Sequence, residues 1–282
     1  MHGFPDKSLL PKKFNRIAKD FNNNAFIHKD IREKLISRIH DINITPNIIL
    51  DAGCGSGDAA FMLHRDFPTA TIFGVDFSTS MIQHAKKSNQ SSAIKFSLGD
   101  IESSKLNKSP DLIYSNLAFP WCNPMILLKH WHHMLNKSGT LLFTTFGPNN
   151  LIELREAWQS IDDDIHIHPA FSAEDLTRLM VDSNFSDVVI DIERLYIEYR
   201  SLQQLWLDIK NTASSNCIVG RPKGLTSTKK WDNFTNILTE KGTPIKITIE
   251  IIYATGKKLE GKRPSLPKDI IIPVESINTR NM

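Results

Sequence analysis

The sequence contains few cysteines and no long apolar segment. Its three cysteines, Cys54, Cys122 and Cys217, are odd in number and widely spaced, which argues against a disulfide framework. We therefore expect reduced thiols and a cytoplasmic location. No apolar run approaches the length needed to cross a bilayer, and the N-terminal stretch MHGFPDKSLLPKKF lacks the apolar core of a signal peptide. These absences favour a soluble protein over a membrane protein or a disulfide-rich secreted domain.

A strong excess of charge of one sign is also absent. The 34 basic and 31 acidic residues leave a formal net charge of +3, which is too small to indicate nucleic-acid binding by itself. The length of 282 residues suffices for one large α/β domain with an elaboration, or for two unequal lobes. We expect a globular protein without a nucleic-acid or membrane partner.

Short apolar runs alternate with helical stretches along much of the chain. Helices are predicted at Ala59–Arg65, Ser80–Lys87 and Leu127–Leu135. The predicted strands around them are Ile48–Leu50, Thr71–Val75, Ile94–Leu98, Asp111–Ser115 and Thr140–Phe146. This alternation indicates a doubly wound, Rossmann-like α/β fold with a mostly parallel sheet. Val188–Tyr199 and Ile245–Thr255 predict two further long strands at the sheet edge, the last of them antiparallel.

The remaining segments divide the chain around this sheet. Apolar residues at helical spacing before Pro46 predict a helical cap, interrupted at Asn22–Asn24. The segment between the two late strands is longer than a hairpin connection needs and predicts a second part of the cap. The expected units are an N-terminal helical cap over 1–44, a cofactor-binding core over 45–199, an inserted cap segment over 200–243, a final strand over 244–256 and a loosely held tail over 257–282.

A glycine-rich turn follows the first predicted strand, in Asn47–Asp58 (NIILDAGCGSGD). Gly53, Gly55 and Gly57 allow positive φ and keep Cβ atoms away from a ligand, and the helix that follows presents free N–H groups. The spacing differs from the G-x-G-x-x-G of dinucleotide-binding proteins. The turn therefore predicts a cradle for another cofactor.

A polar residue lies at or just after the carboxyl end of each of four successive predicted strands, and open α/β sheets bind their ligands at these carboxyl ends. Asp51 is placed to bind a cationic amino-acid moiety, and Asp76 follows the second strand at a position suited to ribose hydroxyls. Asp100 and Ile101 follow the third strand near an expected adenine edge, and Asn116 follows the fourth beside an expected sulfonium. Four such residues in chain order indicate S-adenosyl-L-methionine.

At this level the chain resembles the class I S-adenosylmethionine-dependent methyltransferases. FNRIAKDFNNNA at Phe14–Ala25, SNLAFPWC at Ser115–Cys122 and TFGPNNLIELREAW at Thr145–Trp158 are also similar to the malonyl-acyl-carrier-protein O-methyltransferase family of biotin synthesis. HIHPAFSAEDL at His166–Leu176 and the Lys210–Thr226 region extend this resemblance. The predicted cofactor-binding residues are Asp51, Gly53, Cys54, Gly55, Gly57, Asp76, Phe77, Met81, Asp100, Ile101, Asn116 and Leu117.

The chain departs from the pattern of that family at three positions. The family usually has Tyr where this chain has Phe21, Gln where it has His28, and Gln or His where it has Pro120. The resemblance implies that the residue at position 21 faces the substrate. Phe21 therefore bears on how the substrate is positioned rather than on the class of reaction.

The resemblance implies methyl transfer to the free carboxylate of a malonyl thioester. Such a carboxylate is ionised at pH 7, so no catalytic general base is expected. A bidentate Arg suits a carboxylate, with Arg155 the first candidate, although it is equally compatible with a solvated helix position; Arg16 and Arg200 are weaker candidates. The predicted substrate residues are Phe21, Phe119, Trp121, Phe146, Arg155, His168 and Arg200.

Neither a metal nor a nucleophile is predicted. His166 and His168 lack a third ligand at sensible spacing, so we expect no metal. We expect both histidines to line the substrate entrance or to pack structurally, and only His168 is among the predicted substrate residues. Two other interpretations stay open: a methyltransferase of another small carboxylic acid, and a cofactor-binding assembly factor that does not methylate. A base methyltransferase is a weaker alternative, because residues 116–119 lack the N-P-P-[FY] form.

A basic cluster is the expected contact with acyl carrier protein, although it also fits a solvated loop. It consists of Arg221, Lys223, Lys229 and Lys230.

Overall fold

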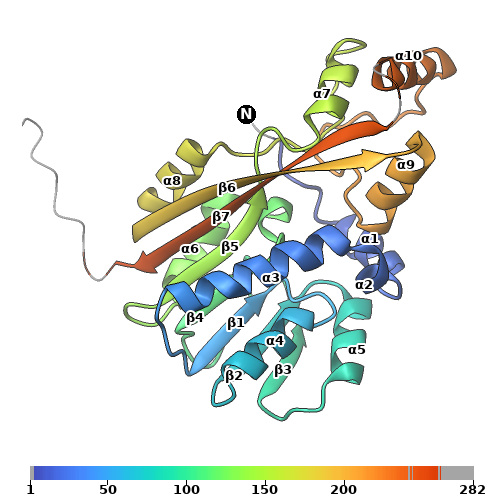
Figure 1. The fold of residues 1–282 in the computed structure, drawn as a ribbon. Helices are drawn as coiled ribbons and strands as arrows, with labels where there is room; N and C mark the ends of the chain where they lie inside the picture. Colours follow the sequence, from blue (N-terminus) through green and yellow to red (C-terminus); the bar gives the residue numbers. More distant parts are fainter. Residues whose placement is uncertain (1–2, 241, 243, 260, 262–282) are drawn as a thin grey trace, which may run out of the picture.

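A single seven-stranded sheet forms the centre of the protein, as the computed structural model shows for residues 3–240, 242, 244–259 and 261 (Figure 1). Its strand order is β3-β2-β1-β4-β5-β7-β6. The strands are β1 (Ile48–Ala52), β2 (Thr71–Asp76), β3 (Ile94–Leu98), β4 (Leu112–Ser115), β5 (Thr140–Phe146), β6 (Phe185–Tyr199) and β7 (Ile245–Lys258).

The strand directions confirm the predicted fold class. β1 to β5 pair in parallel, whereas β7 is antiparallel to both β5 and β6. Side chains of β4 and β5 are buried on both faces of the sheet, as expected for a parallel sheet covered on both sides. β6 is one of the two edge strands, with β3 at the other edge, and it alternates between half-buried and exposed positions along most of its length.

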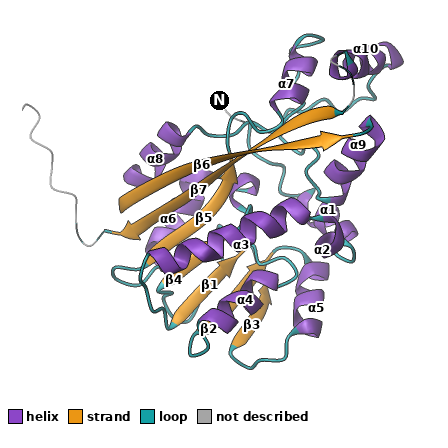
Figure 2. Cartoon of the chain, in the orientation of Figure 1, coloured by secondary structure: helices purple, strands orange, loops and turns teal. Residues whose placement is uncertain are grey.

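Helices cover both faces of the sheet (Figure 2). Apolar residues of α3, α4, α5, α7, α9 and α10 belong to one hydrophobic cluster, and those of α6 and α8 belong to a second. The helices are α1 (Leu10–Ile17), α2 (Phe21–Asn24), α3 (Phe26–Asp41), α4 (Asp58–Asp66), α5 (Thr79–Ser88), α6 (Pro124–Met134), α7 (Ile152–Gln159), α8 (Ala173–Asp182), α9 (Leu202–Asn211) and α10 (Thr228–Thr239), with a short 3-10 helix, η1, at Phe119–Trp121.

The N-terminal segment packs against the segment that separates β6 from β7. Pro5 forms an antiparallel bridge with Ile218, and the Val219 N–H donates to the Phe4 carbonyl at 2.9 Å. α1, α2 and α9 lie close together at the carboxyl ends of the parallel strands (Figure 1). Two parts of the chain about 200 residues apart thus meet over the expected cofactor edge.

Two local features differ from the sequence-based expectation. Asn22–Asn24 form part of α2, and the helical pattern is instead interrupted at residues 18–20 and at Ala25, whose ψ of 52° ends α2. β7 continues to Lys258, two residues into the expected tail, and residues 262–282 of that tail lie outside the described residues. Among the described helices, none has the length and apolar character of a membrane span.

Candidate functional site

The glycine-rich turn after β1 is held against β2 by backbone hydrogen bonds. Gly53 and Cys54 both donate their N–H groups to the Val75 carbonyl, at 2.8 and 3.1 Å. Gly53 has a φ of 78°, and a Cβ added there would lie 2.3 Å from the Ala118 Cβ. A side chain at this position would therefore be strained and would fill the space beside the turn.

Asp76 fixes the same turn from the end of β2. Its carboxylate accepts the Gly55 N–H at 3.0 Å and the Ser78 N–H at 2.8 Å. Burial raises the pKa of Asp76 to about 6, although these two backbone hydrogen bonds oppose the shift. The remaining lone pairs of the carboxylate can accept hydroxyl groups of a ribose.

Asp51 is the most deeply buried acid of the turn. It is 1% exposed, and its Oδ2 atom has no hydrogen-bond partner among the described residues. Burial raises the pKa of Asp51 to about 8, the charge of Asp76 adds to the rise, and the Arg32 guanidinium opposes it. Asp51 makes no ion pair among the described contacts, and a buried carboxylate favours such a partner, so the ammonium group of S-adenosylmethionine fits here.

Asn116 has a structural function at the end of β4. Its side-chain amide donates to the His28 carbonyl at 3.0 Å and accepts the Thr144 hydroxyl at 2.9 Å. The Leu117 N–H in turn donates to the same hydroxyl at 2.9 Å. Asn116 thus connects α3 of the cap to the sheet while it lines the cofactor cavity.

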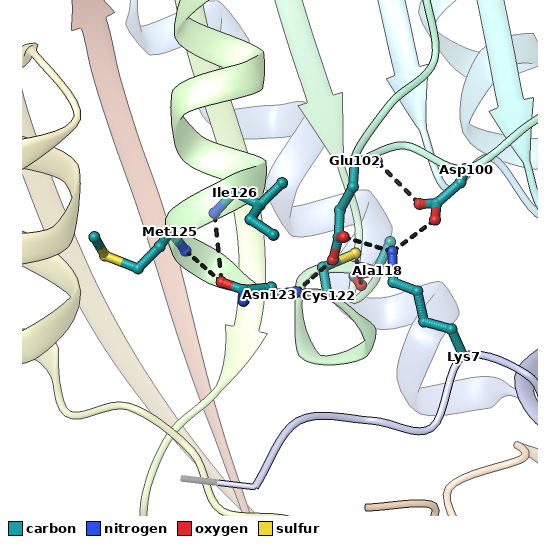
Figure 3. Close-up of polar contacts among 8 residues, drawn as sticks. All are labelled: Lys7, Asp100, Glu102, Ala118, Cys122, Asn123, Met125 and Ile126. Carbon is teal, nitrogen blue, oxygen red and sulfur yellow. Dashed lines mark hydrogen bonds and ion pairs between the residues drawn. The ribbon is translucent and has the colours of Figure 1, made fainter. Parts of the chain in front are cut away.

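Lys7 reaches from the N-terminal segment to Asp100 at the end of β3 (Figure 3). Its ammonium lies 2.6 Å from Asp100 Oδ2 and 2.7 Å from Glu102 Oε2. The Glu102 N–H donates to Asp100 Oδ1 at 3.0 Å, and Glu102 accepts the Asn123 N–H. This network joins the segment before α1 to the loop that precedes α6. A lone Lys in a polar segment gives no sequence signal, so it was not predicted.

A cavity of about 280 Å³ lies over these strand ends. The structure brings every predicted cofactor residue except Gly57 to its wall. Gly57 is the N-cap of α4, and a Cβ there would lie 2.7 Å from the Phe96 ring, so this glycine permits packing behind the turn. Wall residues that sequence reasoning missed include Lys7, Leu10, Pro11, Phe14, Arg32 and Ser56.

A second cavity of about 490 Å³ adjoins the first. The two share His28, Trp121 and Cys122 in their walls. Four predicted substrate residues, Phe119, Trp121, Phe146 and His168, line the second cavity. Phe21 lines the cofactor cavity instead. The structure brings neither Arg155 nor Arg200 to either cavity.

Arg155 binds the loop that precedes its own helix. Its guanidinium donates to the Pro148 carbonyl and, at 3.4 Å, to the Asn150 carbonyl. Arg200 is exposed in the turn after β6. Arg16, the other weak candidate, is exposed in the last turn of α1. The guanidinium groups of Arg155 and Arg200 thus lie outside the described walls of both cavities.

The motif around Arg155 joins α7 to β7. Glu250 on β7 accepts the Asn149 N–H at 3.0 Å and its side-chain amide at 2.9 Å. Glu153 accepts the Thr248 N–H at 2.9 Å and also the Thr248 hydroxyl. Asn149, Glu153 and Arg155 of this motif thus bind protein. Other members of the motif line the second cavity, namely Thr145, Phe146, Asn150, Leu151, Leu154 and Trp158.

The two predicted entrance histidines have different surroundings. The His166 ring stacks on Trp158 at 3.9 Å and bonds Asp162 at 2.7 Å, and the Lys230 ammonium binds the same Asp162 at 2.7 Å. Burial lowers the pKa of His168, whose ring meets Trp121 edge-on at 5.6 Å. Asp162 and His166 with Asp164 could group around a cation, but the Lys230 ammonium already supplies a positive charge there.

The strand order, the glycine-rich turn and the acids at the strand ends define a class I, S-adenosylmethionine-dependent methyltransferase. A family model described as "Methyltransferase domain" matches residues 47–242. Malonyl-[acyl-carrier protein] O-methyltransferase 1 of Coxiella burnetii is 30% identical over 98% of this chain and 97% of its own length. The enzyme of the same name from Legionella pneumophila is 30% identical over 95% of this chain and 96% of its own. The chain belongs to the malonyl-[acyl-carrier protein] O-methyltransferase family.

Solved structures agree with the fold. The YcgJ protein from Bacillus subtilis superposes with a TM-score of 0.60 at 17% identity, over 81% of this chain and 99% of that chain. Phosphoethanolamine N-methyltransferase 2 of Haemonchus contortus, solved with S-adenosyl-L-methionine, gives a TM-score of 0.52 at 14% identity, over 80% of this chain and 53% of that chain.

Replacement of Lys7 by Met is expected to weaken cofactor binding about 3- to 10-fold, because partly exposed ion pairs contribute about 1 kcal/mol or less each. The substitution leaves Asp100 and Glu102 without their shared cation and releases the segment that carries Leu10 and Phe14 to the cavity wall. Calorimetric titration with S-adenosylhomocysteine measures the effect. Lys12→Met, at an exposed position of the same segment, is the control; equal affinities of the two variants would contradict the expectation.

Proposed function

We propose that this protein transfers a methyl group from S-adenosylmethionine to the free carboxylate of malonyl-acyl carrier protein. The product is the methyl ester that starts pimeloyl and biotin synthesis. The observation that carries the proposal is the pair of adjoining cavities, one over the strand ends and one apolar. The names of the full-length relatives identify the acceptor.

The cofactor, when bound, supplies a methyl group that its sulfonium makes electrophilic. Asp51 and Asp76 would hold its ammonium and ribose groups, and Met81 and Phe77 would line the space around it. The acceptor carboxylate is ionised at neutral pH, so the protein need not remove a proton. The walls of the two cavities would align the reacting atoms and exclude water, which is the main source of rate in such a reaction.

The second cavity suits a short acyl chain with one polar end. Phe119, Trp121 and Phe146 supply apolar wall, and His168 lies among them. The negative charge of the acceptor disappears as the ester forms, so an apolar surrounding favours the transition state over the charged ground state. These wall residues, rather than Arg155 or Arg200, are the proposed substrate contacts.

The proposed docking site for the carrier protein is the loop before α10 and the start of that helix. Lys230 is paired with Asp162, and Arg221 lies 4.0 Å from Asp6 and donates to the Ile218 carbonyl. Lys223 and Lys229 are exposed beside a fully exposed Leu225. Trp231, next along α10, lines the second cavity, so an acidic carrier docked there would lie beside the substrate cavity.

Substitution of both exposed lysines, Lys223→Glu and Lys229→Glu, is expected to raise the KM for malonyl-carrier protein about 10-fold or more. Charge reversal opposes an acidic partner, whereas the KM for malonyl-CoA should change less than about 2-fold, because a small thioester needs no docking surface. Steady-state kinetics with both acceptors measure the difference. An equal change for the two acceptors would remove this loop from the docking site.

A cytoplasmic location is part of the proposal. Cys54, Cys122 and Cys217 are all buried free thiols, which fits a reducing compartment.

Transfer of labelled methyl from S-adenosylmethionine tests the function. We expect label in malonyl-carrier protein at a higher rate than in malonyl-CoA, and none in carrier protein without the malonyl group. Preference for a free carboxylic acid of another kind would replace the acceptor in this proposal. Cofactor binding without transfer to any of these acceptors would contradict methyltransferase function.

A further inference from the structure

His28 occupies the boundary between the two cavities. It lies in the first turn of α3 and lines both cavities, together with Trp121 and Cys122. The reacting atoms must meet at this boundary, because the methyl donor belongs to one cavity and the acceptor to the other. Burial raises the pKa of the Cys122 thiol well above its usual value, so it stays neutral and is a weak hydrogen-bond donor.

The backbone and ring of His28 are held in place by neighbours. Asn116 at the end of β4 donates its side-chain N–H to the His28 carbonyl at 3.0 Å. The Phe21 ring meets the imidazole edge-on, with centroids 5.3 Å apart. The Nδ1 atom is nevertheless buried without a hydrogen-bond partner among the described residues. The described residues therefore hold the ring by packing and not by a hydrogen bond at Nδ1, and an unpaired buried nitrogen is destabilising by about 1–3 kcal/mol.

The imidazole is uncharged at neutral pH. Burial lowers the pKa of His28 to about 4, and the charge of Arg32 acts in the same direction. A neutral imidazole has one N–H donor and one lone pair. With the lone pair on the buried Nδ1, the N–H is on Nε2, which is then the donor for a ligand.

A neutral donor suits this reaction better than a cation does. The carboxylate carries a full negative charge before transfer and none afterwards. A buried Arg or Lys would stabilise the charged ground state more than the transition state, which slows the chemical step. One hydrogen bond from a neutral donor also orients the carboxylate, but it stabilises the charged ground state less than an Arg or Lys would, so it raises the barrier to transfer less. Among the described lining residues, the second cavity has no Arg, and its lysine, Lys210 of α9, is exposed rather than buried.

We propose that the neutral imidazole of His28 donates a hydrogen bond to the acceptor carboxylate and so points its other oxygen at the methyl group. That oxygen forms the new bond to the methyl carbon, and the electron pair of the broken C–S bond stays on sulfur. No proton is transferred, so His28 ends the reaction as it began. The inference rests on the proposed function, which supplies the carboxylate.

The test compares three substitutions at this position. His28→Leu should lower kcat/KM for malonyl-carrier protein about 10- to 100-fold, the range expected for one hydrogen bond to a charged group. His28→Gln, whose amide reaches about as far as Nε2, should stay within about 5-fold of wild type. His28→Asn, whose amide reaches only as far as Nδ1, should behave like the Leu variant if the donor is Nε2. Affinity for S-adenosylhomocysteine should change less than about 2-fold in all three.

A matched control is His64→Leu. This histidine also has an unpartnered buried Nδ1 but lines neither cavity, so its loss should leave kcat/KM within about 2-fold. Unchanged kcat/KM in His28→Leu would overturn the inference, as would a fall that the Gln variant shares in full.

The failure of the proposed function has a different signature. A wild-type protein that does not methylate malonyl-carrier protein would overturn the proposed function. The contact of His28 with the carboxylate can then be tested without turnover, by comparing the affinity of wild type and His28→Leu for malonyl-carrier protein in the presence of S-adenosylhomocysteine. Equal affinities would then overturn the role of His28 as well.

Discussion

Asp51→Asn is expected to weaken binding of S-adenosylmethionine about 100-fold while it stabilises the free protein. Asp51 is 1% exposed and has an unpartnered oxygen at the wall of the cofactor cavity. The loss of a buried carboxylate that pairs with an ammonium removes about 3 kcal/mol of binding free energy. The free protein gains, because the neutral amide needs no proton to be taken up on folding, whereas Asp51 must bind one to be buried at neutral pH.

The sign of the pH dependence follows from the raised pKa. Burial and the neighbouring Asp76 raise the pKa of Asp51 to about 8, from 3.8. Between these values the folded protein binds more protons than the unfolded chain, so the free energy of unfolding falls as pH rises from about 4 to about 8. Asp76, with a pKa of about 6, contributes in the same direction over the lower part of this range. The ammonium group of the cofactor pairs with the ionised form of Asp51, so the cofactor binds more tightly as this carboxyl group loses its proton. The increase in the free energy of unfolding that the cofactor causes should therefore grow between pH 6 and 8.

Calorimetric titration with S-adenosylhomocysteine and thermal melting at several pH values measure both effects. Asp41→Asn, at an exposed position at the end of α3, is the control and should change neither quantity. An affinity of Asp51→Asn within about 3-fold of wild type would contradict the assignment of Asp51 to the ammonium group.

Glu250→Gln is expected to lower the free energy of unfolding by about 2–4 kcal/mol. The Glu250 side chain is 2% exposed and accepts hydrogen bonds from Asn149 and, at 2.6 Å, from the Arg194 guanidinium. The amide of Gln offers one acceptor oxygen in place of two, and its NH2 group would face the N–H donors that the second oxygen now accepts. The substitution also removes the negative charge from a buried charged network, and the loss of one partner of such a network is strongly destabilising. Denaturant unfolding measures the change.

The control for this substitution is Arg194→Gln. The Arg194 side chain is 54% exposed, and its loss leaves both Asn149 hydrogen bonds to the Glu250 carboxylate in place. It should therefore lower the free energy of unfolding by less than Glu250→Gln does. Because the loop that Glu250 holds also carries Asn150 and Leu151 of the second cavity, Glu250→Gln should raise the KM for the acyl acceptor as well. Equal stability of Glu250→Gln and wild type would show that this network does not hold α7 to β7.

The sheet and the cofactor cavity could be predicted because their signals are local. Each parallel strand is a short apolar run, and the residue at its carboxyl end necessarily lies at the ligand-binding edge. Asp51, Asp76, Asp100 and Asn116 were therefore found from their sequence positions, and the structure brings them to one cavity.

Contacts made across the fold had no such signal. Lys7, His28 and Arg32 reach the cavities from the N-terminal segment, and their positions depend on packing against strand ends about 50 to 100 residues away. The guanidinium of Arg155 suits a carboxylate ligand, but the carbonyls of its own loop accept its hydrogen bonds. The motif around Arg155 has a distinctive sequence because Asn149 and Glu153 must form hydrogen bonds with β7. A sequence pattern cannot tell such contacts within the protein from contacts with a ligand.

The mass of malonyl-carrier protein after incubation with the enzyme and S-adenosylmethionine tests the central claim most directly. We predict a gain of one methylene on the carrier protein. After hydroxylamine has released the acyl group from its thioester, NMR should show the added methyl as a methoxy group. No gain in mass, or an added methyl that NMR places on carbon, would contradict transfer to the carboxylate.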